Sequence, residues 1–104
     1  MMTDDVKVLS APLERVGALL ERHITEHAGW TLGPVERELG EVRARALVGL
    51  GRAPDQVRFA LAAGPDATTE IAADVISKSR WTRAVSARRR IEALLAAVSA
   101  ALEA

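Results

Sequence analysis

Three residues in the first third of the chain, His23, Glu26 and His27, have the types and spacing of a metal-dependent hydrolase. Histidines four positions apart lie on the same face of a helix, where both imidazoles can bind one Zn²⁺ ion. Glu26 between them could activate a water bound to that ion. A catalytic zinc needs a third protein ligand, and no helix that would supply one is expected soon after His27. The spacing supports a zinc hydrolase only as a remote alternative.

The order H-x-x-E-H is the signature of inverted zinc metallopeptidases. It fits equally a helix end at which two histidines border the apolar stripe, because the helix dipole favours histidine near the C-terminus. We favour this second interpretation, and we expect neither a metal ion nor a cofactor.

A basic cluster between Ser77 and Arg90 is the second candidate site, since this stretch has six basic and no acidic residues. It predicts an anion- or partner-binding site, with an indole ring that could stack on a ligand. The alternative is a solvated junction whose arginines pair with acids of the first half of the chain. We favour the alternative, because three consecutive arginines cannot share one helix face. The cluster consists of Lys78, Arg80, Trp81, Arg83, Arg88, Arg89 and Arg90.

Length and composition indicate a single globular domain, 1–104, with an apolar share of 49%. The net charge of zero argues against a dedicated nucleic-acid-binding protein. The chain has no cysteine, no leader pattern at its start and no apolar run long enough to span a membrane, so we expect a cytoplasmic protein. Arginine outnumbers lysine twelve to two and alanine is abundant, which is typical of proteins from high-GC bacterial genomes.

The apolar periods predict a sequence of short elements. They indicate a short strand at 5–9, a helix at 12–28, strands at 41–51, 56–63 and 68–78, and a helix at 84–103. Residues 35–51 fit a helix or a strand. The glycines at positions 40, 49 and 51 favour the strand over 41–51, because glycine weakens a helix. We interpret Gly33-Pro34 as a turn and 35–39 as an irregular segment or a short strand.

This order of elements predicts an α+β fold, a two-layer sandwich. A small antiparallel sheet of three or four strands would have an N-terminal and a C-terminal helix on one face. The alternative is an all-α bundle, because runs rich in alanine discriminate poorly between helix and strand, and the chain has 20 alanines. A sheet with one face uncovered must hide its apolar groups, which makes a homodimer plausible.

Two blocks of the sequence resemble the START-like, or Bet v 1-like, superfamily of polyketide cyclases and lipid-transfer proteins. TTEIAADVISKSRW followed by ARRRIEALLAAVSAALEA resembles the end of those proteins, a strand and then a long amphipathic helix, and VKVLSAPLERVGALLERH resembles their start. A short bacterial family of unknown function has a similar strand-to-helix end, matched here by Ser77, Ser79, Arg80, Arg89, Arg90 and Ile91. Full START-like domains are longer and have more strands. The resemblance implies no catalytic residue.

We predict a small non-enzymatic module that binds a partner, either another protein or a second copy, through an exposed sheet face or edge and the basic cluster. The alternative is a START-like protein that binds a small apolar ligand or lipid, or acts as a cyclase-type enzyme. Its ligand pocket would lie between helix and sheet and be lined by Leu20, Ile24, Phe59, Ile71, Leu94 and Val98.

Overall fold

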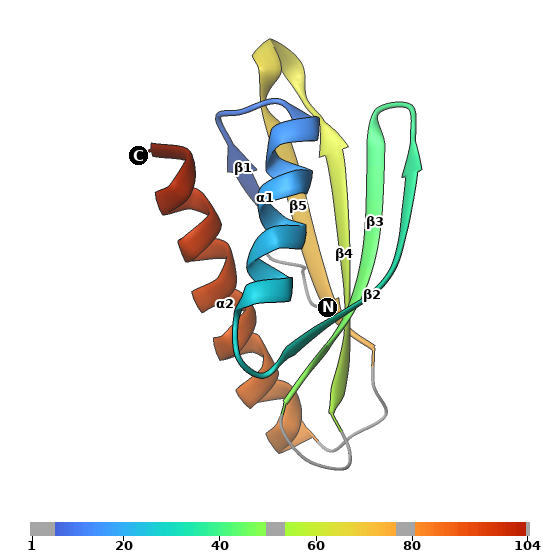
Figure 1. The fold of residues 1–104 in the computed structure, drawn as a ribbon, viewed down its shortest axis with the longest axis vertical. Helices are drawn as coiled ribbons and strands as arrows, with labels where there is room; N and C mark the ends of the chain where they lie inside the picture. Colours follow the sequence, from blue (N-terminus) through green and yellow to red (C-terminus); the bar gives the residue numbers. More distant parts are fainter. Residues whose placement is uncertain (1–5, 50–53, 77–80, 104) are drawn as a thin grey trace.

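Two helices cover one face of an antiparallel sheet in the computed structural model of the protein (Figure 1). The structure describes residues 6–49, 54–76 and 81–103, with the side chains of 81–86 left out. The elements are β1 (Val6–Leu9), α1 (Leu13–Glu26), β2 (Trp30–Glu38), β3 (Glu41–Val48), β4 (Asp55–Ala63), β5 (Thr69–Val75) and α2 (Trp81–Glu103). The predicted α+β class is confirmed, and the all-α alternative is wrong.

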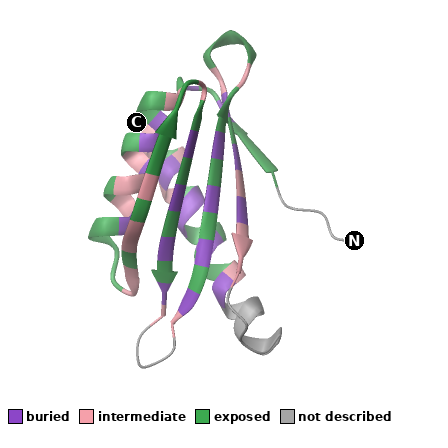
Figure 2. Ribbon diagram, turned by 90° about the vertical axis from the view of Figure 1, so that its right-hand side faces the viewer, coloured by how far each residue is buried: buried purple, intermediate pink, exposed green. Residues whose placement is uncertain are grey.

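The described residues form five strands, in the order β1-β5-β4-β3-β2, rather than the three or four expected. Every neighbouring pair of strands is antiparallel. Buried and exposed residues alternate strictly along β3, and along β4 as far as Ala62 (Figure 2). Because side chains of a strand point alternately to opposite faces, this pattern assigns one face of the sheet to the core and the other to solvent.

The core lies between the sheet and both helices, with Phe59 of β4 fully buried in it. Val16, Leu20 and Ile24 line the buried stripe of α1 at helical spacing. Leu94 and Val98 do the same for α2. The helix α1 packs against α2 and against β2, β3 and β4, whereas α2 packs against β4 and β5. Within the described chain, neither helix is both long and apolar enough to cross a bilayer.

Residues 30–38 form a complete edge strand, which the sequence analysis only partly predicted. Trp30 opens β2 and pairs with Val48, and its ring centroid lies 5.9 Å from that of Phe59. The Gly33-Pro34 step is a break in the strand register rather than a turn that separates two elements. An edge strand tolerates such a step, because proline has no N–H to donate and at an edge none is required on the solvent side.

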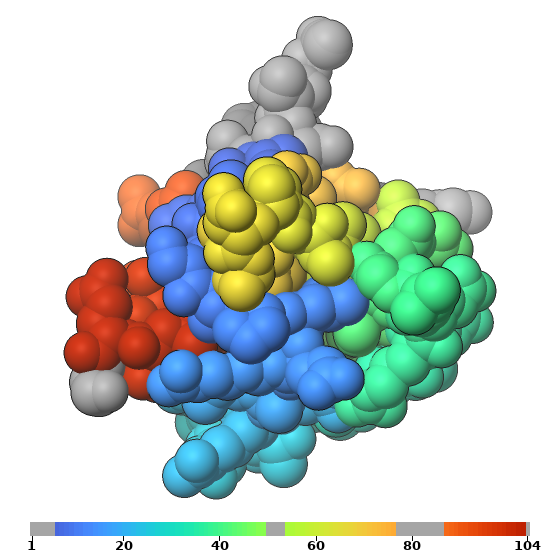
Figure 3. Space-filling view, turned by 90° about the horizontal axis from the view of Figure 1, so that it is seen from above, coloured from blue at the N-terminus to red at the C-terminus, as the bar shows by residue number. Residues whose placement is uncertain are grey.

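A buried hydrogen bond ties the start of α1 to the far end of the sheet. The hydroxyl of Thr69, on β5, donates to the carbonyl oxygen of Ala11 over 2.8 Å, and the Thr69 side chain is fully buried. Seen from above, the turn between β4 and β5 (yellow) lies against the segment that leads into α1 (blue) (Figure 3). Beyond the other end of α1, Gly29 has a positive φ of 87°, and its carbonyl oxygen accepts a hydrogen bond over 2.8 Å from the N–H of Gly49, just after β3. Hydrogen bonds thus connect the chain on both sides of α1 to the sheet.

Candidate binding surface on the open face of the sheet

The open face is the side of the sheet opposite the helices, and the strand register shows which residues share it. In its middle row, Glu36 pairs with Arg43, Arg43 with Ala60, Ala60 with Ala72, and Ala72 with Val6. This row crosses all the described strands from one edge to the other. No described element covers the row, because α1 and α2 both lie behind the sheet (Figure 2).

Three arginines gather next to this row, on the neighbouring strands β3 and β4. Arg45 stands directly opposite Arg58 in the register, and Arg43 is two residues from Arg45 on the same face. Together with Pro34 and Glu36 the three arginines line a hollow of about 320 Å³. Like charges directly opposite each other in a sheet are destabilising, so the Arg45–Arg58 pair lowers the stability of the isolated chain.

Two of these arginines have carboxylate partners within the sheet. Arg58 donates to Asp74 on β5 over 3.3 Å, and Arg43 donates to Glu41 over the same distance. Arg45 forms no ion pair with any residue in the described part of the chain. Its guanidinium group is exposed and available to a carboxylate from outside.

A second pair of like charges lies across β2 and β3, four residues before Arg45 along β3. Glu38 of β2 stands directly opposite Glu41 of β3, next to the hairpin that joins them. Glu70 of β5 lies in the same row, separated from Glu41 by Ala62. The open face therefore has an acidic end around Glu41 and a basic patch around Arg45.

Between the charges the face is apolar and built of small side chains. Ala60, Ala62 and Ala72 form the floor of a hollow of about 290 Å³ whose walls include Val6, Glu41 and Glu70. On the edge strand β1, Val6 is 53% exposed and Val8 is 61% exposed. Exposed β-branched side chains beside a flat alanine floor are typical of a surface that another protein can approach closely.

The structure describes only part of the predicted basic cluster, and the described arginines lie beside different parts of the fold. Lys78 and Arg80 lie outside the described residues, and Trp81 and Arg83 belong to the start of α2, where only the backbone is described. Arg89 is exposed on α2.

Arg88 and Arg90 lie beside different parts of the fold. Arg88 lines a hollow between α2 and the sheet edge formed by β1 and β5. Arg90 lies against the turn between α1 and β2, where a Cβ atom added at Gly29 would come within 2.9 Å of Arg90 Nη1. Arg88 therefore lies near β1, at one edge of the sheet, whereas Arg90 lies near the start of β2, at the other edge. This agrees with the expectation that the consecutive arginines do not share one face.

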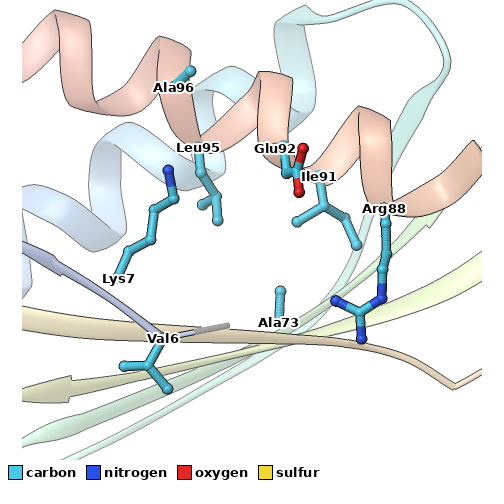
Figure 4. Close-up of a pocket in the computed structure, with 8 residues that line it drawn as sticks. All are labelled: Val6, Lys7, Ala73, Arg88, Ile91, Glu92, Leu95 and Ala96. Atoms are coloured by element: carbon cyan, nitrogen blue, oxygen red, sulfur yellow. The ribbon is translucent and has the colours of Figure 1, made fainter. Parts of the chain in front are cut away.

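The residues predicted to line a ligand pocket all belong to the core, at 0 to 1% exposure: Leu20, Ile24, Phe59, Ile71, Leu94 and Val98. None of these six lines a described hollow. The largest described hollow, about 650 Å³, lies instead at the edge of the sheet beside α2 (Figure 4). Lys7 of β1 and Glu92 of α2 stand at its sides, and Ala73, Ile91 and Leu95 supply apolar surface.

The two histidines of the H-x-x-E-H motif lie side by side at the end of α1, with ring centroids 5.2 Å apart. His27 Nδ1 donates to the carbonyl oxygen of His23 over 2.8 Å. His23 Nδ1 is buried and has no hydrogen-bond partner in the described chain. Across the described residues, no third His, Cys, Asp or Glu side chain joins these two as a metal ligand. A zinc site here would lack a ligand that catalytic sites use.

A scan against protein-family models finds no matching family, and a search of curated proteins finds no significant match. The resemblance of the chain ends to START-like proteins stays a prediction.

The arginine cluster of the open face was not among the predicted site residues. Arg43, Arg45 and Arg58 each stand at an outward position of an alternating strand, which the sequence pattern already indicates. Their grouping follows from the register, in which Arg45 faces Arg58 across the β3–β4 pair. The alternation shows that these arginines point outward but not which of them face each other, because that depends on the register of the strand pair.

We predict that replacing Arg45 by glutamate stabilises the monomeric chain. Arg45→Glu converts a repulsive pair with Arg58 into an attractive one, which should raise the free energy of unfolding by about 0.2–1 kcal/mol. Arg43→Glu is the matched control on the same strand and face. It should lower the free energy of unfolding, because position 43 lies opposite Glu36 and beside Glu41. Urea unfolding at a protein concentration at which the chain is monomeric measures both changes. If Arg45→Glu lowers the free energy of unfolding as much as Arg43→Glu does, the proposed repulsion between Arg45 and Arg58 is wrong.

Proposed function

We propose that the protein is a small non-enzymatic module that binds another protein chain through the open face of its sheet. The observation that carries this proposal is Arg45, which forms no ion pair with any described residue and stands opposite a like charge on an uncovered face. A charged residue that lowers the stability of its own fold can be retained because it contributes to function. Binding surfaces are places where a protein gives up some folding stability for binding.

Three properties of the open face support a protein partner. The alanine floor lets another backbone approach closely, and Val6 and Val8 add exposed apolar surface. The arginines beside this floor match the composition of protein interfaces, in which arginine is enriched. The acids Glu36, Glu38 and Glu41 share the face and would repel the phosphates of a nucleic acid.

Site-specific photo-crosslinking in cells that naturally make the protein tests this proposal. A benzophenone side chain in place of Val8, an exposed residue at the rim of the open face, should yield a discrete adduct with another polypeptide. The matched control is the same side chain at Ala100, which is also exposed but lies on α2. We expect an adduct from position 8 and none from position 100.

The result that would overturn the proposal is the absence of any adduct from position 8 in a folded, expressed variant. Equal adducts from positions 8 and 100 would also overturn it, because they would indicate random collision rather than a binding face.

A second candidate function, the binding of an amphiphilic anion, is favoured by the hollow between α2 and the sheet edge. Its volume of about 650 Å³ lies in the range of small-molecule sites. Its apolar surface from Ala73, Ile91 and Leu95 suits an aliphatic chain, and Lys7 at its side suits a carboxylate (Figure 4). The resemblance to lipid-transfer proteins of the START-like superfamily is consistent with such a ligand.

Titration with a medium-chain fatty acid, decanoate, tests the second candidate. We predict that Lys7→Glu weakens binding about tenfold or more, because it replaces the attraction between ammonium and carboxylate by a repulsion. Arg89→Glu is the control, since it changes the net charge equally at an exposed position of α2 that does not line the hollow. Isothermal titration calorimetry measures the affinities. Equal weakening in both variants, or no binding tighter than about 1 mM, would contradict this function.

A further inference from the structure

The partner that the open face fits best is another copy of itself. We propose that two copies of the chain form a homodimer in which their open faces pack against each other around a two-fold axis. This inference rests on the proposed function, and it names the partner that the open face binds. Its support comes from the charge pattern, the small side chains and the area of that face.

At positions 41 and 45 the charges of the open face are complementary to their own arrangement after a half-turn. Glu36 and Arg43, in the middle row, instead each come over the same residue of the other copy, one strand away from the opposite charge. On β3, Glu41 and Arg45 lie two residues to either side of Arg43, in the middle row of the sheet. A two-fold axis that runs along this middle row, perpendicular to the strands, exchanges the two ends of every strand. It therefore places Glu41 of one copy over Arg45 of the other. The same contact forms a second time by symmetry, because a two-fold interface is self-complementary.

This arrangement compensates for both like-charge pairs of the single chain. The acidic pair, Glu38 with Glu41, comes over the basic patch of Arg45 and Arg58, displaced by one strand. The displacement is about 5 Å, which the side chain of an arginine can cover. Glu70 comes over Asp74 of the other copy, a contact between like charges that Arg58 reduces, because its guanidinium group donates to Asp74. Arg45 gains a carboxylate partner, which none of the described residues of its own chain provides.

The shape of the face permits the close contact that this pairing requires. Two sheets packed face to face lie about 10 Å apart, with their side chains interleaved. Ala60, Ala62 and Ala72 occupy the centre of the face and leave room for the longer side chains around them. The apolar floor and Val6 would then be removed from water on both copies.

The area of the face is sufficient for a specific but weak dimer. Strands about 4.8 Å apart and up to nine residues long give the five-stranded sheet a footprint of roughly 500 Å² per copy. Both copies together would bury about 1,000 Å², which is near the lower limit for a specific protein interface. We therefore expect a dissociation constant of about 1–100 μM.

A charge exchange between two variants tests the homodimer. Arg45→Glu makes positions 41 and 45 both acidic, and Glu41→Arg makes both basic, so each variant alone brings like charges together at these two contacts and should be monomeric. An equimolar mixture should form a heterodimer, because both Glu–Arg contacts are restored between the two variants. Sedimentation equilibrium measures the dissociation constants. We expect each single variant to weaken self-association tenfold or more (about 1.4 kcal/mol) and the mixture to regain most of it. Circular dichroism confirms that each variant is folded.

Arg89→Glu is the control, since it alters an exposed charge on α2 and should dimerise like the wild type. A wild-type chain that stays monomeric to several hundred micromolar would overturn the homodimer. So would a mixture that does not associate, or an Arg89→Glu variant that loses association as fully as Arg45→Glu.

The photo-crosslink at position 8 separates failure of the homodimer from failure of the proposed function. An adduct with the mass of two chains supports the homodimer. An adduct with a different protein overturns the homodimer and leaves the proposed function intact, whereas the absence of an adduct overturns both.

Discussion

The packing of both helices against the same face of one sheet is the constraint on which the rest of the structure depends. Phe59 and its neighbours on alternate positions of β3, β4 and β5 bury their side chains toward α1 and α2. The hydrogen bond between Thr69 and Ala11 fixes the start of α1 on the same side. Because side chains alternate along a strand, burial of one face determines which residues occupy the other. How the core forms thus decides which positions of the strands make up the open face.

The open face could have been covered with neutral polar side chains, and instead it carries two directly opposed like-charge pairs. Arg45 faces Arg58, and Glu38 faces Glu41. Each pair is unfavourable within one chain, but the two are opposite in sign and lie in different rows of the sheet, one across β3 and β4 and the other across β2 and β3. Binding of a chain with the reversed charge pattern would compensate for both pairs at once. A surface that serves only for solubility would explain neither.

Much of this architecture was predictable from residue periods, and the remainder depended on strand pairing. The alternation in 41–51 and 56–63 correctly predicted β3 and β4, since burial of every second residue leaves a clear pattern in the sequence. The strand β2 was predicted only in part, because Gly33 and Pro34 interrupt its alternation and resemble a turn. The arginine cluster was missed because its members are far apart in the sequence and meet only through the register. The residues proposed for a ligand pocket have the apolar pattern of a cavity lining, but apolar side chains at such positions fill a core equally well.

Backbone amide resonances followed on dilution test most directly whether two copies of the chain associate through their open faces. Spectra recorded from about 1 mM to about 10 μM cross the range in which a dimer of this area should dissociate. We predict that chemical shifts change on β3, β4 and β5, with the largest changes around Arg43, Ala60 and Ala72. They should stay constant on the outer surfaces of α1 and α2. Shifts that are constant everywhere, or that change on the helices and not on the sheet, would contradict the homodimer.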